Sequence, residues 1–468
     1  MIEITPYLHS NKDVPLYVQL YEYIKNEIQI GTIKVGEKLP SKRNLAKHLG
    51  ISQNTVITAY EQLCAEGYLE SKQRKGIFVA MTEHDLFETT KNAVELNKNS
   101  KQKDSIKYKI DFSLGNIDLD YFPYYLWKRL SILTLDADQS DLFLNGDPQG
   151  EECLRKEISM YIFQSRGVKC LPEQIVIGAG TQFLLSLLYK LIGKEYEYAI
   201  EDPGFYKARI VLKDQGAVVH PISLDDEGIN IKQLRKSAAR VVYVTPSHQF
   251  PYGMVMSISR RMELLKWAEE IDGYIIEDDF DSEFRYKGNL IPSLQGLDSK
   301  ERVIYTGTFS KSLIPSIRLS FLVLPQRLLQ GYNEHYTIYN QTVSRFHQYT
   351  LYKFMKDGYW SSHLNKMRTL YRKKQKLLLT AINNYMGKNV EIIGSKSGLH
   401  ILLCVKNGMS EEELIQSAHK LDIKVCPISI HYNLYENSLP PKIILGFSGV
   451  KETQIDEGIK LLKKAWLI

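Results

Sequence analysis

The sequence predicts an α/β chain in two parts. A small N-terminal module of helices and a hairpin is joined by a linker to a large domain with a mostly parallel, doubly wound sheet. In the N-terminal module, apolar residues recur at the spacing of an amphipathic helix. From residue 174 onward, predicted strands alternate with predicted helices. The 468 residues, 44% of them apolar, also exceed one ordinary core. We place the module at residues 1–80, the linker at 81–110 and the large domain at 111–468.

Composition indicates the cellular compartment of the chain and the kinds of partner it has. The five cysteines are dispersed and have no C-x-x-C spacing, which argues against a disulfide framework or a zinc site and fits a reducing cytosol. The N-terminus has no apolar signal core, and no apolar run approaches the length that spans a bilayer. The net charge of +6 is too mild to imply nucleic acid by itself. We expect a cytoplasmic protein without a membrane partner or a metal.

A helix-turn-helix motif is predicted within residues 1–80. Residues 15–31 form a first amphipathic helix, and residues 39–50 and 52–67 form two more around a tight turn at Gly50. Residues 68–80 then predict a hairpin with a basic tip. Two short helices joined by a tight turn are typical of a helix-turn-helix.

The small module offers side chains suited to DNA. Gln53, Asn54 and Thr55 stand at the start of the last predicted helix, where short polar side chains reach base edges in a major groove. Hydroxyl and basic side chains nearby are candidates for phosphate or minor-groove contacts: Ser41, Lys42, Arg43, Arg74 and Lys75. The alternative is an ordinary three-helix bundle with a solvated hairpin. The order of the elements favours DNA binding.

The stretch PSKRNLAKHLGISQNTVITAYEQLCAEGYL, followed by KGIFV, resembles the winged helix-turn-helix of GntR-type bacterial regulators. The resemblance implies that double-stranded operator DNA is bound by Arg43, by Gln53 to Thr55 and by a wing tip of Lys75 and Gly76. The family usually has arginine where Gln53 stands, so operator sequences cannot be transferred from relatives. Residues 82–107 are polar and without a sustained period, which indicates a flexible or partly helical linker.

The large domain is predicted from its alternating pattern. Strands are expected at 174–178, 196–200, 240–245, 274–278 and 303–307, with helices at 181–192, 205–215 and 258–271. Residues 330–380 predict long helices, and residues 398–405, 424–429 and 442–448 predict strands of a small C-terminal subdomain. Ligands of doubly wound sheets bind at the carboxyl ends of the strands. We therefore expect the site there.

The stretch VIYTGTFSKSLIPSIRLSF (303–321) carries the main candidate for chemistry. Lys311 follows a buried strand, and Arg318 comes seven residues later. An imine with an aldehyde cofactor needs an amine whose pKa can be lowered, which lysine provides. Thr308, Ser310 and Arg318 suit the phosphate of such a cofactor. Taken alone, the stretch fits a solvated lysine on a serine-rich turn equally well.

Other strand ends supply the rest of such a site. Asp278 suits a pyridinium nitrogen as its partner, although Asp279 and Asp281 differ from it only by register. Further candidates are turn residues that would cradle phosphate, an aromatic ring that would stack on a pyridine and one more strand-end residue: Gly180, Thr181, Gln182, Phe205 and His248.

These residues together resemble fold type I pyridoxal 5'-phosphate (PLP) enzymes of the aspartate aminotransferase superfamily. With the N-terminal module, almost the whole chain resembles the MocR/GabR subfamily of GntR regulators, through TPSHQFPYG (245–253), EDDFDSEF (277–284), GTFSKSLIPSIRLSF (307–321) and GLH (398–400). The resemblance implies PLP bound as an imine on Lys311. It also implies a head-to-tail homodimer in which each winged module lies over the partner's large domain.

Four positions depart from the pattern of this family. The member that senses 4-aminobutyrate has Tyr where Phe280 stands and two carboxylate-binding arginines where Lys207 and His431 stand, and aminotransferases have Asn where Phe250 stands. Lys207 keeps the charge without the fork of arginine, and His431 is largely neutral near pH 7. We expect Lys207 and His431 to contact the effector, and we expect that 4-aminobutyrate is not the effector.

Three functions remain open. The first is a PLP-dependent transcription regulator that senses an amine or amino acid through an external aldimine formed at the Lys311 position, or that senses PLP itself. The second is a functional aminotransferase with an appended DNA-binding module, and the third is a DNA-binding protein on a PLP-free scaffold. The missing arginines disfavour full turnover, and Asp278, Lys311 and Arg318 disfavour the scaffold. We expect a regulator with at most partial transamination.

Overall fold

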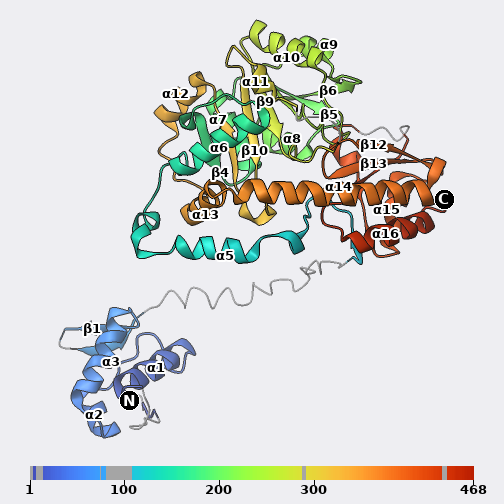
Figure 1. Ribbon diagram of the computed structural model, residues 1–468. Coiled ribbons are helices and arrows are strands. Elements are labelled where there is room, and N and C mark those ends of the chain that lie inside the picture. The colour runs from blue at the N-terminus through green and yellow to red at the C-terminus, as the bar shows by residue number, and fades with distance from the viewer. Residues whose placement is uncertain (1–3, 7–13, 74, 81–107, 287–290, 435–439) are drawn as a thin grey trace. The chain divides into compact units, whose positions relative to one another are not determined.

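The computed structural model describes residues 4–6, 14–73, 75–80, 108–286, 291–434 and 440–468. The chain divides into two compact units, Met1–Ile106 and Lys107–Ile468 (Figure 1). Most of the predicted linker, residues 81–107, lies outside the described residues. At the end of that predicted linker, Ile110 is buried in a core of the large unit. Residues 108–110 therefore belong to the fold of the large unit.

The small unit has the predicted order of three helices and a hairpin: α1 (Leu16–Gln29), α2 (Lys42–Leu49), α3 (Gln53–Ala65), β1 (Leu69–Lys72) and β2 (Gly76–Val79). Ser41 and Ser52 are the N-caps of α2 and α3, and their hydroxyls accept backbone N–H groups at 3.2 and 3.1 Å. Gly50 ends α2 with φ 64°, a left-handed conformation that suits glycine.

A separate core holds the small unit together. It is built from buried apolar side chains of all three helices and the hairpin: Leu20, Ile24, Ile28, Leu45, Val56, Ala59, Tyr60, Leu63, Leu69 and Val79. Their spacing on each helix is the amphipathic spacing that predicted the helices. The small unit therefore has the packing of an independent domain.

The large unit contains the remaining helices and strands: β3 (Ile110–Asp111), α5 (Tyr124–Leu133), α6 (Glu152–Arg166), β4 (Ile175–Gly178), α7 (Thr181–Ile192), β5 (Tyr198–Asp202), α8 (Tyr206–Asp214), β6 (Val219–Asp225), β7 (Gly228–Ile229), α9 (Ile231–Lys236), β8 (Val241–Val244), α10 (Ile258–Glu270), β9 (Tyr274–Asp279), α11 (Leu294–Leu297), β10 (Val303–Thr308), β11 (Ser320–Val323), α12 (Gln326–His335), α13 (Arg345–Lys356), α14 (Tyr359–Tyr385), β12 (Val390–Ile393), β13 (His400–Val405), α15 (Glu411–His419), β14 (Ile423–Lys424), β15 (Cys426–Pro427), β16 (Lys442–Gly446) and α16 (Glu452–Ala465).

An eight-stranded sheet organises the large unit, in the order β4-β11-β10-β9-β8-β5-β6-β7. The five central strands from β10 to β6 run parallel, while β11 is antiparallel to both β10 and β4. This is the mostly parallel sheet that the alternating sequence predicted. The carboxyl ends of β5, β8, β9 and β10 meet at one edge of the sheet.

Helices cover both faces of this sheet (Figure 1). Along β10, Ile304 packs into a core with α7, α8 and α12, whereas Val303 and Tyr305 pack on the opposite face against α10 and α6. Along β9, Ile276 and Ile275 divide between the faces in the same way. Because side chains alternate along a strand, both faces of these central strands are buried, which explains their continuous apolar runs.

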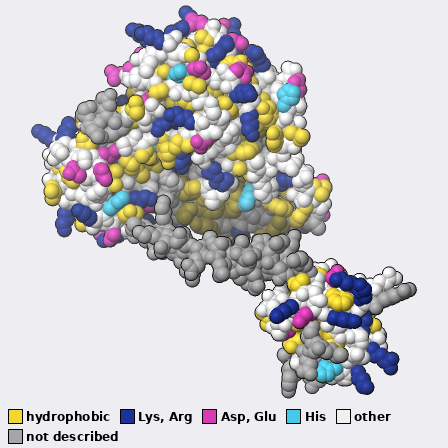
Figure 2. Space-filling view, turned by 180° about the vertical axis from the view of Figure 1, so that it is seen from behind, with side chains coloured by type: hydrophobic (Ala, Val, Ile, Leu, Met, Phe, Trp, Pro, Cys, Tyr) yellow, Lys and Arg dark blue, Asp and Glu magenta, His cyan; other side chains and the backbone are white. Residues whose placement is uncertain are grey.

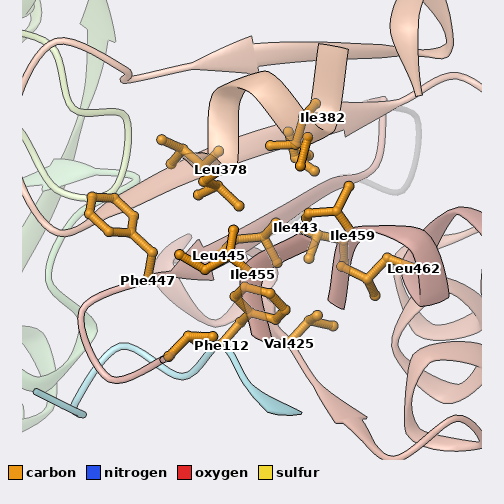
Figure 3. Close-up of a cluster of buried hydrophobic side chains, with 14 of the residues drawn as sticks. Phe112, Leu378, Ile382, Val425, Ile443, Leu445, Phe447, Ile455, Ile459 and Leu462 are labelled. Atoms are coloured by element: carbon orange, nitrogen blue, oxygen red, sulfur yellow. The ribbon is translucent and has the colours of Figure 1, made fainter. Parts of the chain in front are cut away.

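A smaller sheet in the order β12-β13-β16-β15 forms the C-terminal subdomain. Figure 3 shows its core, in which Leu378 and Ile382 of α14, Ile443 and Leu445 of β16, and Ile455 of α16 point toward one another. Phe112, which follows β3, belongs to the same core and is fully buried. The segment after the predicted linker is thereby fixed to the C-terminal subdomain.

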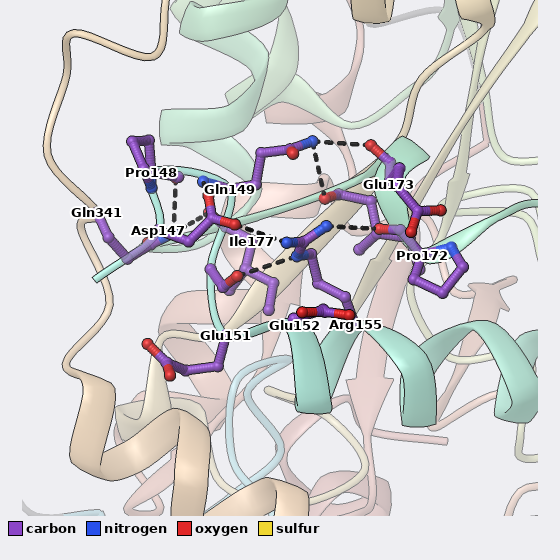
Figure 4. A network of polar contacts seen from close by, with 12 residues as sticks. Asp147, Pro148, Gln149, Glu151, Glu152, Arg155, Pro172, Glu173, Ile177 and Gln341 are labelled. Carbon is purple, nitrogen blue, oxygen red and sulfur yellow. Dashed lines mark hydrogen bonds and ion pairs between the residues drawn. The ribbon is translucent and has the colours of Figure 1, made fainter. Parts of the chain in front are cut away.

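The turn at residues 147–150 fixes α6 beside the large sheet (Figure 4). The Gly150 N–H donates to the Asp147 carbonyl at 2.8 Å and closes this turn. Arg155 of α6 donates to the carbonyls of Gly150 and Pro172, each at 2.9 Å, and pairs with the Asp147 carboxylate at 2.7 Å. One buried guanidinium thus joins the turn to the segment that precedes β4.

None of the helices in the described ranges is both long and apolar enough to cross a bilayer. The five cysteines are all free thiols.

Candidate functional site

A cavity of about 420 Å³ lies at the carboxyl ends of β9 and β10. Most of the predicted cofactor residues line it, together with both predicted effector residues: Thr181, Gln182, Phe205, Lys207, Asp278, Thr308, Ser310, Lys311, Arg318 and His431. Gly180 and His248 are not part of the lining, although each contacts a residue that is. The strand ends therefore converge as expected for this type of sheet.

The register of β9 separates the three candidate carboxylates. Asp278 has the same parity as Ile276 and lies on the α7 face, where it lines the cavity. Asp279 points to the opposite face and pairs with Arg166 of α6 at 2.7 Å. Asp281 pairs with His248, with 2.9 Å between Oδ1 and Nδ1. Asp281 also lines the cavity, but of these two carboxylates it is Asp278 that keeps an oxygen without a hydrogen-bond partner among the described residues.

The two carboxylate oxygens of Asp278 differ in their hydrogen bonding. The Tyr243 hydroxyl donates to Oδ2 of Asp278, whereas Oδ1 is buried without a hydrogen-bond partner among the described residues. Burial raises the pKa of Asp278 to about 7, and the nearby charges of Asp279 and Asp281 add to the shift. A cationic N–H placed in the cavity would satisfy Oδ1 and favour the charged carboxylate.

Lys311 presents its amine to the same cavity. Its Nζ donates to the carbonyl of Leu114 at 3.3 Å. Burial lowers the pKa of Lys311, the Asp281 charge opposes this shift, and the Lys207 charge adds to it. A lysine with a lowered pKa has a larger neutral fraction, and the neutral amine is the form that attacks an aldehyde.

The start of α7 forms an anion cradle. Gly180 is the N-cap residue with φ 93°, and a Cβ built there would lie 2.2 Å from Nη2 of Arg318. Arg318 itself adopts φ 50°, a strained conformation for arginine that sets its guanidinium beside the helix start. Thr308 adds a hydroxyl network, because it accepts from Ser320 at 2.8 Å and donates to Ser310 at 3.2 Å. Free backbone N–H groups at a helix start and a guanidinium suit phosphate.

The far side of the cavity is aromatic and nearly uncharged. The ring of Phe250 packs edge-on against His431, Phe205 and Phe280, with ring centroids 4.7, 5.9 and 5.9 Å away. Lys207 is exposed at this side, with its Nζ 6.0 Å from the centroid of the Tyr206 ring. The two predicted effector residues thus differ in setting, since His431 is buried and Lys207 is not.

The residues present fit PLP. An unpartnered carboxylate oxygen on Asp278 matches a protonated pyridine nitrogen. The Gly180 and Arg318 cradle, which a side chain on residue 180 would fill, matches a phosphate. The Lys311 amine matches an aldehyde.

Two supporting residues escaped the sequence argument. Tyr243 lies inside an apolar strand, so nothing in its pattern marked it as the partner of Asp278. His400 lies beside His248, with ring centroids 5.2 Å apart, and burial lowers its pKa to about 3. Ligand atoms of His248, Asp281 and His400 lie within 4.8 Å of one another. Within this cluster His248 pairs with Asp281 and His400 with the carbonyl of Pro251 at 2.9 Å, whereas Nε2 of His248 has no hydrogen-bond partner among the described residues.

The small unit presents most of its predicted DNA residues. Gln53, Asn54 and Arg43 are exposed, whereas the Thr55 hydroxyl lies 2.9 Å from that of the cap residue Ser52. Ser41 is exposed but is used as a helix cap, Lys42 is half-buried, and Arg74 lies outside the described residues. Lys75 and Gly76 are exposed at the hairpin. Figure 2 shows Lys and Arg side chains (dark blue) spread over the visible face of this unit.

Comparisons with known proteins agree with this division. Residues 16–79 match the family "Bacterial regulatory proteins, gntR family", and residues 108–437 match "Aminotransferase class I and II". The HTH-type transcriptional regulator YdeL of Bacillus subtilis is 46% identical, over 100% of each chain. The "Probable rhizopine catabolism regulatory protein MocR" of Rhizobium meliloti is 33% identical, over 98% of this chain and 95% of its own.

Two further comparisons bear on the large unit. The "HTH-type pyridoxine biosynthesis transcriptional regulator PdxR" of Corynebacterium glutamicum is 30% identical, over 85% of each chain. Among solved structures, an archaeal alanine:glyoxylate aminotransferase superposes with a TM-score of 0.70 at 24% identity, covering 82% of this chain and 95% of its own. That structural likeness establishes the aminotransferase fold.

Proposed function

Because this chain belongs to the MocR/GabR subfamily of gntR-family regulators, with a DNA-binding module followed by an aminotransferase class I and II domain, we propose that it is a PLP-dependent transcription regulator. A cytoplasmic homodimer would bind operator DNA through its two small units. The large unit would hold PLP and respond to an amine or to PLP itself. The observation that carries the proposal is the cavity that joins Lys311, the unpartnered oxygen of Asp278 and the Gly180–Arg318 cradle.

When bound, PLP supplies an aldehyde and an electron-withdrawing ring. Lys311, with its lowered pKa, would hold the aldehyde end, and Asp278 would keep a proton on the ring nitrogen. Gly180, Thr181, Gln182, Thr308, Ser310 and Arg318 would hold the phosphate, and Phe205 would lie against the ring. An amine entering the cavity would meet Lys207, Phe250 and His431 on the far side.

Coupling to DNA would follow from differential affinity. An amine biases DNA binding only if it binds one arrangement of the dimer more tightly than another. The subfamily supports a head-to-tail homodimer in which each small unit lies over the partner's large unit. A shift between the two large units would then change the spacing of the two DNA-binding helices, and with it the affinity for a two-part operator.

An absorbance titration tests the proposal. Full-length protein should give a new near-visible band with added PLP, and the Lys311→Ala variant should not, while both keep the same circular dichroism. Amines that shift this band should also change the affinity for a genomic DNA fragment selected by the protein, measured by fluorescence anisotropy. A wild-type protein that gives no band with PLP would overturn the proposal.

A second function is favoured by one observation. The lowered pKa of Lys311 also suits proton transfer in transamination, as expected of a functional aminotransferase with an appended DNA module. Steady formation of product from an amino acid and a 2-oxo acid would support that alternative. The weak provision for carboxylates at Lys207 and His431 supports the regulator instead.

A further inference from the structure

Asp281 is a buried carboxylate at the wall of the cavity, and the proposed cofactor site leaves it without a role. Its side chain is 2% exposed, and its two oxygens lie 2.9 and 3.1 Å from Nδ1 of His248. An ionised carboxylate only accepts hydrogen bonds, so Nδ1 of His248 is the donor. A second proton, on Nε2 of His248, would be buried without an acceptor among the described residues. The pair therefore keeps the negative charge of Asp281.

The ring of His248 is fixed in this position by the backbone around it. A Cβ built on Gly398 would lie 1.9 Å from Cε1 of His248, and a Cβ built on Gly253 would lie 3.1 Å from Nε2. The ring of Phe280 packs against the same imidazole, with the ring centroids 5.9 Å apart. Because the imidazole has no room to turn, its hydrogen bond holds the Asp281 carboxylate at one place on the cavity wall.

The charge of Asp281 acts on the amine of Lys311. Burial is the largest influence on this amine and lowers its pKa, and the Asp281 charge is the strongest influence that raises it. Nζ of Lys311 donates its hydrogen bond to the Leu114 carbonyl at 3.3 Å. Asp281 therefore acts on Lys311 as a charge across the cavity, and Leu114 is the hydrogen-bond partner.

The other titratable groups near Lys311 are less able to control its proton. Lys207 is exposed, so solvent and salt screen its charge. Burial raises the pKa of the Cys426 thiol, which is therefore neutral near pH 7. Burial also lowers the pKa of His400 to about 3, so this ring is neutral as well.

Two further charged residues line the cavity, Asp278 and Arg318. In the proposed site Asp278 faces the ring nitrogen of PLP and Arg318 faces the phosphate, so each of these charges is balanced by a part of the cofactor. Asp281 remains as the charge in the described cavity lining that is available to the Lys311 nitrogen.

We propose that Asp281, fixed by His248, is the counter-charge that determines whether the Lys311 nitrogen carries a proton. Asp281 is in this role a positioning residue, because it acts through Lys311. The inference deepens the proposed function and rests on it for the use of PLP. It assigns to the His248 and Asp281 pair the control of the pH range in which neutral Lys311 captures an aldehyde.

Competitive labelling of PLP-free, full-length protein measures the proton on Lys311 directly. The rate at which acetic anhydride acetylates Lys311 is followed against pH by peptide mass spectrometry, because only the neutral amine reacts. In Asp281→Asn the midpoint of this profile should lie about one pH unit below that of the wild type, since the counter-charge is gone. Asp272→Asn is the matched control, because Asp272 is an exposed acid that is not part of the cavity lining. Its midpoint should equal that of the wild type.

Substitutions at His248 test how Asp281 is held, and they decide the question if circular dichroism shows that Asp281→Asn does not fold. His248→Phe keeps a ring but leaves the buried carboxylate without a donor. The carboxylate should then take up a proton, and the midpoint should fall as in Asp281→Asn. His248→Asn keeps an N–H donor and should return the midpoint toward the wild-type value. A rise of the midpoint in His248→Phe would show that His248 is a cation that cancels the Asp281 charge, and would overturn the inference.

The PLP-loaded protein gives a second readout of the same proton. Its near-visible band depends on whether the Lys311 nitrogen is protonated, so a pH titration of the band yields another midpoint. This midpoint should also be about one pH unit lower in Asp281→Asn and unchanged in Asp272→Asn.

The outcomes separate the inference from the function on which it rests. An unchanged labelling midpoint in folded Asp281→Asn overturns the inference and leaves the regulator proposal standing. Absence of a PLP band in the wild type overturns the proposed function, and labelling of the PLP-free protein still decides the role of Asp281.

Discussion

At the scale of single residues, Asp278 has a consequence for stability. Its raised pKa means that, between about pH 4 and pH 7, the folded state holds a proton that the unfolded state has released. Asp278 therefore contributes to the free energy of unfolding of the PLP-free protein a part that falls as the pH rises through this range, opposite in sign to the part from buried His400. In Asp278→Asn the slope should be shallower by up to about 1.4 kcal/mol per pH unit. Urea denaturation at several pH values measures it.

Two other buried acids also contribute to the pH dependence of the free energy of unfolding. Burial raises the pKa of Glu201 and of Glu283 to about 7, so each adds a slope of the same sign. Asp278→Asn should therefore reduce the slope without abolishing it. An unchanged slope in this variant would contradict the buried, half-paired state of Asp278.

Gly180 offers a second residue-scale prediction. Gly180→Ala should weaken PLP binding about tenfold or more, because the added Cβ occupies the place of the Arg318 guanidinium. Gly167→Ala is the matched control, since Gly167 also has a positive φ but meets no atom within 4 Å of its Cβ. Gly167→Ala should lose about 1 kcal/mol of stability from its left-handed backbone, and Gly180→Ala should lose more, because φ 93° and ψ 161° lie in a region nearly confined to glycine. Equal PLP affinities in the two variants, measured by fluorescence titration, would argue against the cradle.

Most of the site residues named from the sequence line the cavity, but the sequence could not name their partners. Lys311 and Arg318 were found because a lysine after a strand and a nearby arginine form a recognisable pattern. Asp278 was separated from Asp279 only by the direction in which the strand points each side chain. The pairing of His248 with Asp281, and of Tyr243 with Asp278, depends on strands that are distant in sequence, so no local pattern contained it.

At the scale of elements, one buried ion pair joins α6 to β9. Arg166 and Asp279 have side chains that are 5% and 2% exposed, and Tyr305 donates to the same carboxylate at 2.5 Å. Arg166→Met would leave the Asp279 charge buried without its cation, so the large unit should lose about 3–5 kcal/mol of unfolding free energy. Chemical denaturation followed by circular dichroism measures this loss.

The exposed pair of Lys156 and Glu152 on the same helix is the control for that variant. Lys156→Met should change the stability very little, because exposed ion pairs contribute little. A loss in Arg166→Met no larger than in Lys156→Met would show that the buried pair does not hold the two elements together.

Strong periodicity made most elements predictable. The helix at residues 181–192 was predicted with its observed bounds, because Gly180 precedes it and Gly193 follows it. β6, β11, β12 and α16 had no counterpart among the predicted elements. β6 contains Pro221, which argues against a strand in sequence. β11 follows the Arg318 turn so closely that its first two residues were taken as part of one longer stretch.

At the scale of the whole molecule, two separate cores predict two unfolding events. The small unit and the large unit each bury their own apolar residues, so calorimetry should resolve two transitions. PLP should raise the midpoint of the large-unit transition alone, because a ligand stabilises only the unit that binds it. Leu63→Ala, in the small-unit core, should lower the other midpoint. A single transition shifted by both changes would contradict independent units.

The alternation of side chains along β9 also limits how the gene for this chain can change. Successive carboxylates serve opposite faces, Asp278 toward the cavity and Asp279 toward Arg166. Deleting or inserting one codon within this strand would move every following side chain to the opposite face of the sheet. Apolar and acidic side chains would then all be misplaced by the same change. Homologous chains should therefore vary in residue type along this strand far more readily than in its length, whereas the loops that follow it remain open to insertions.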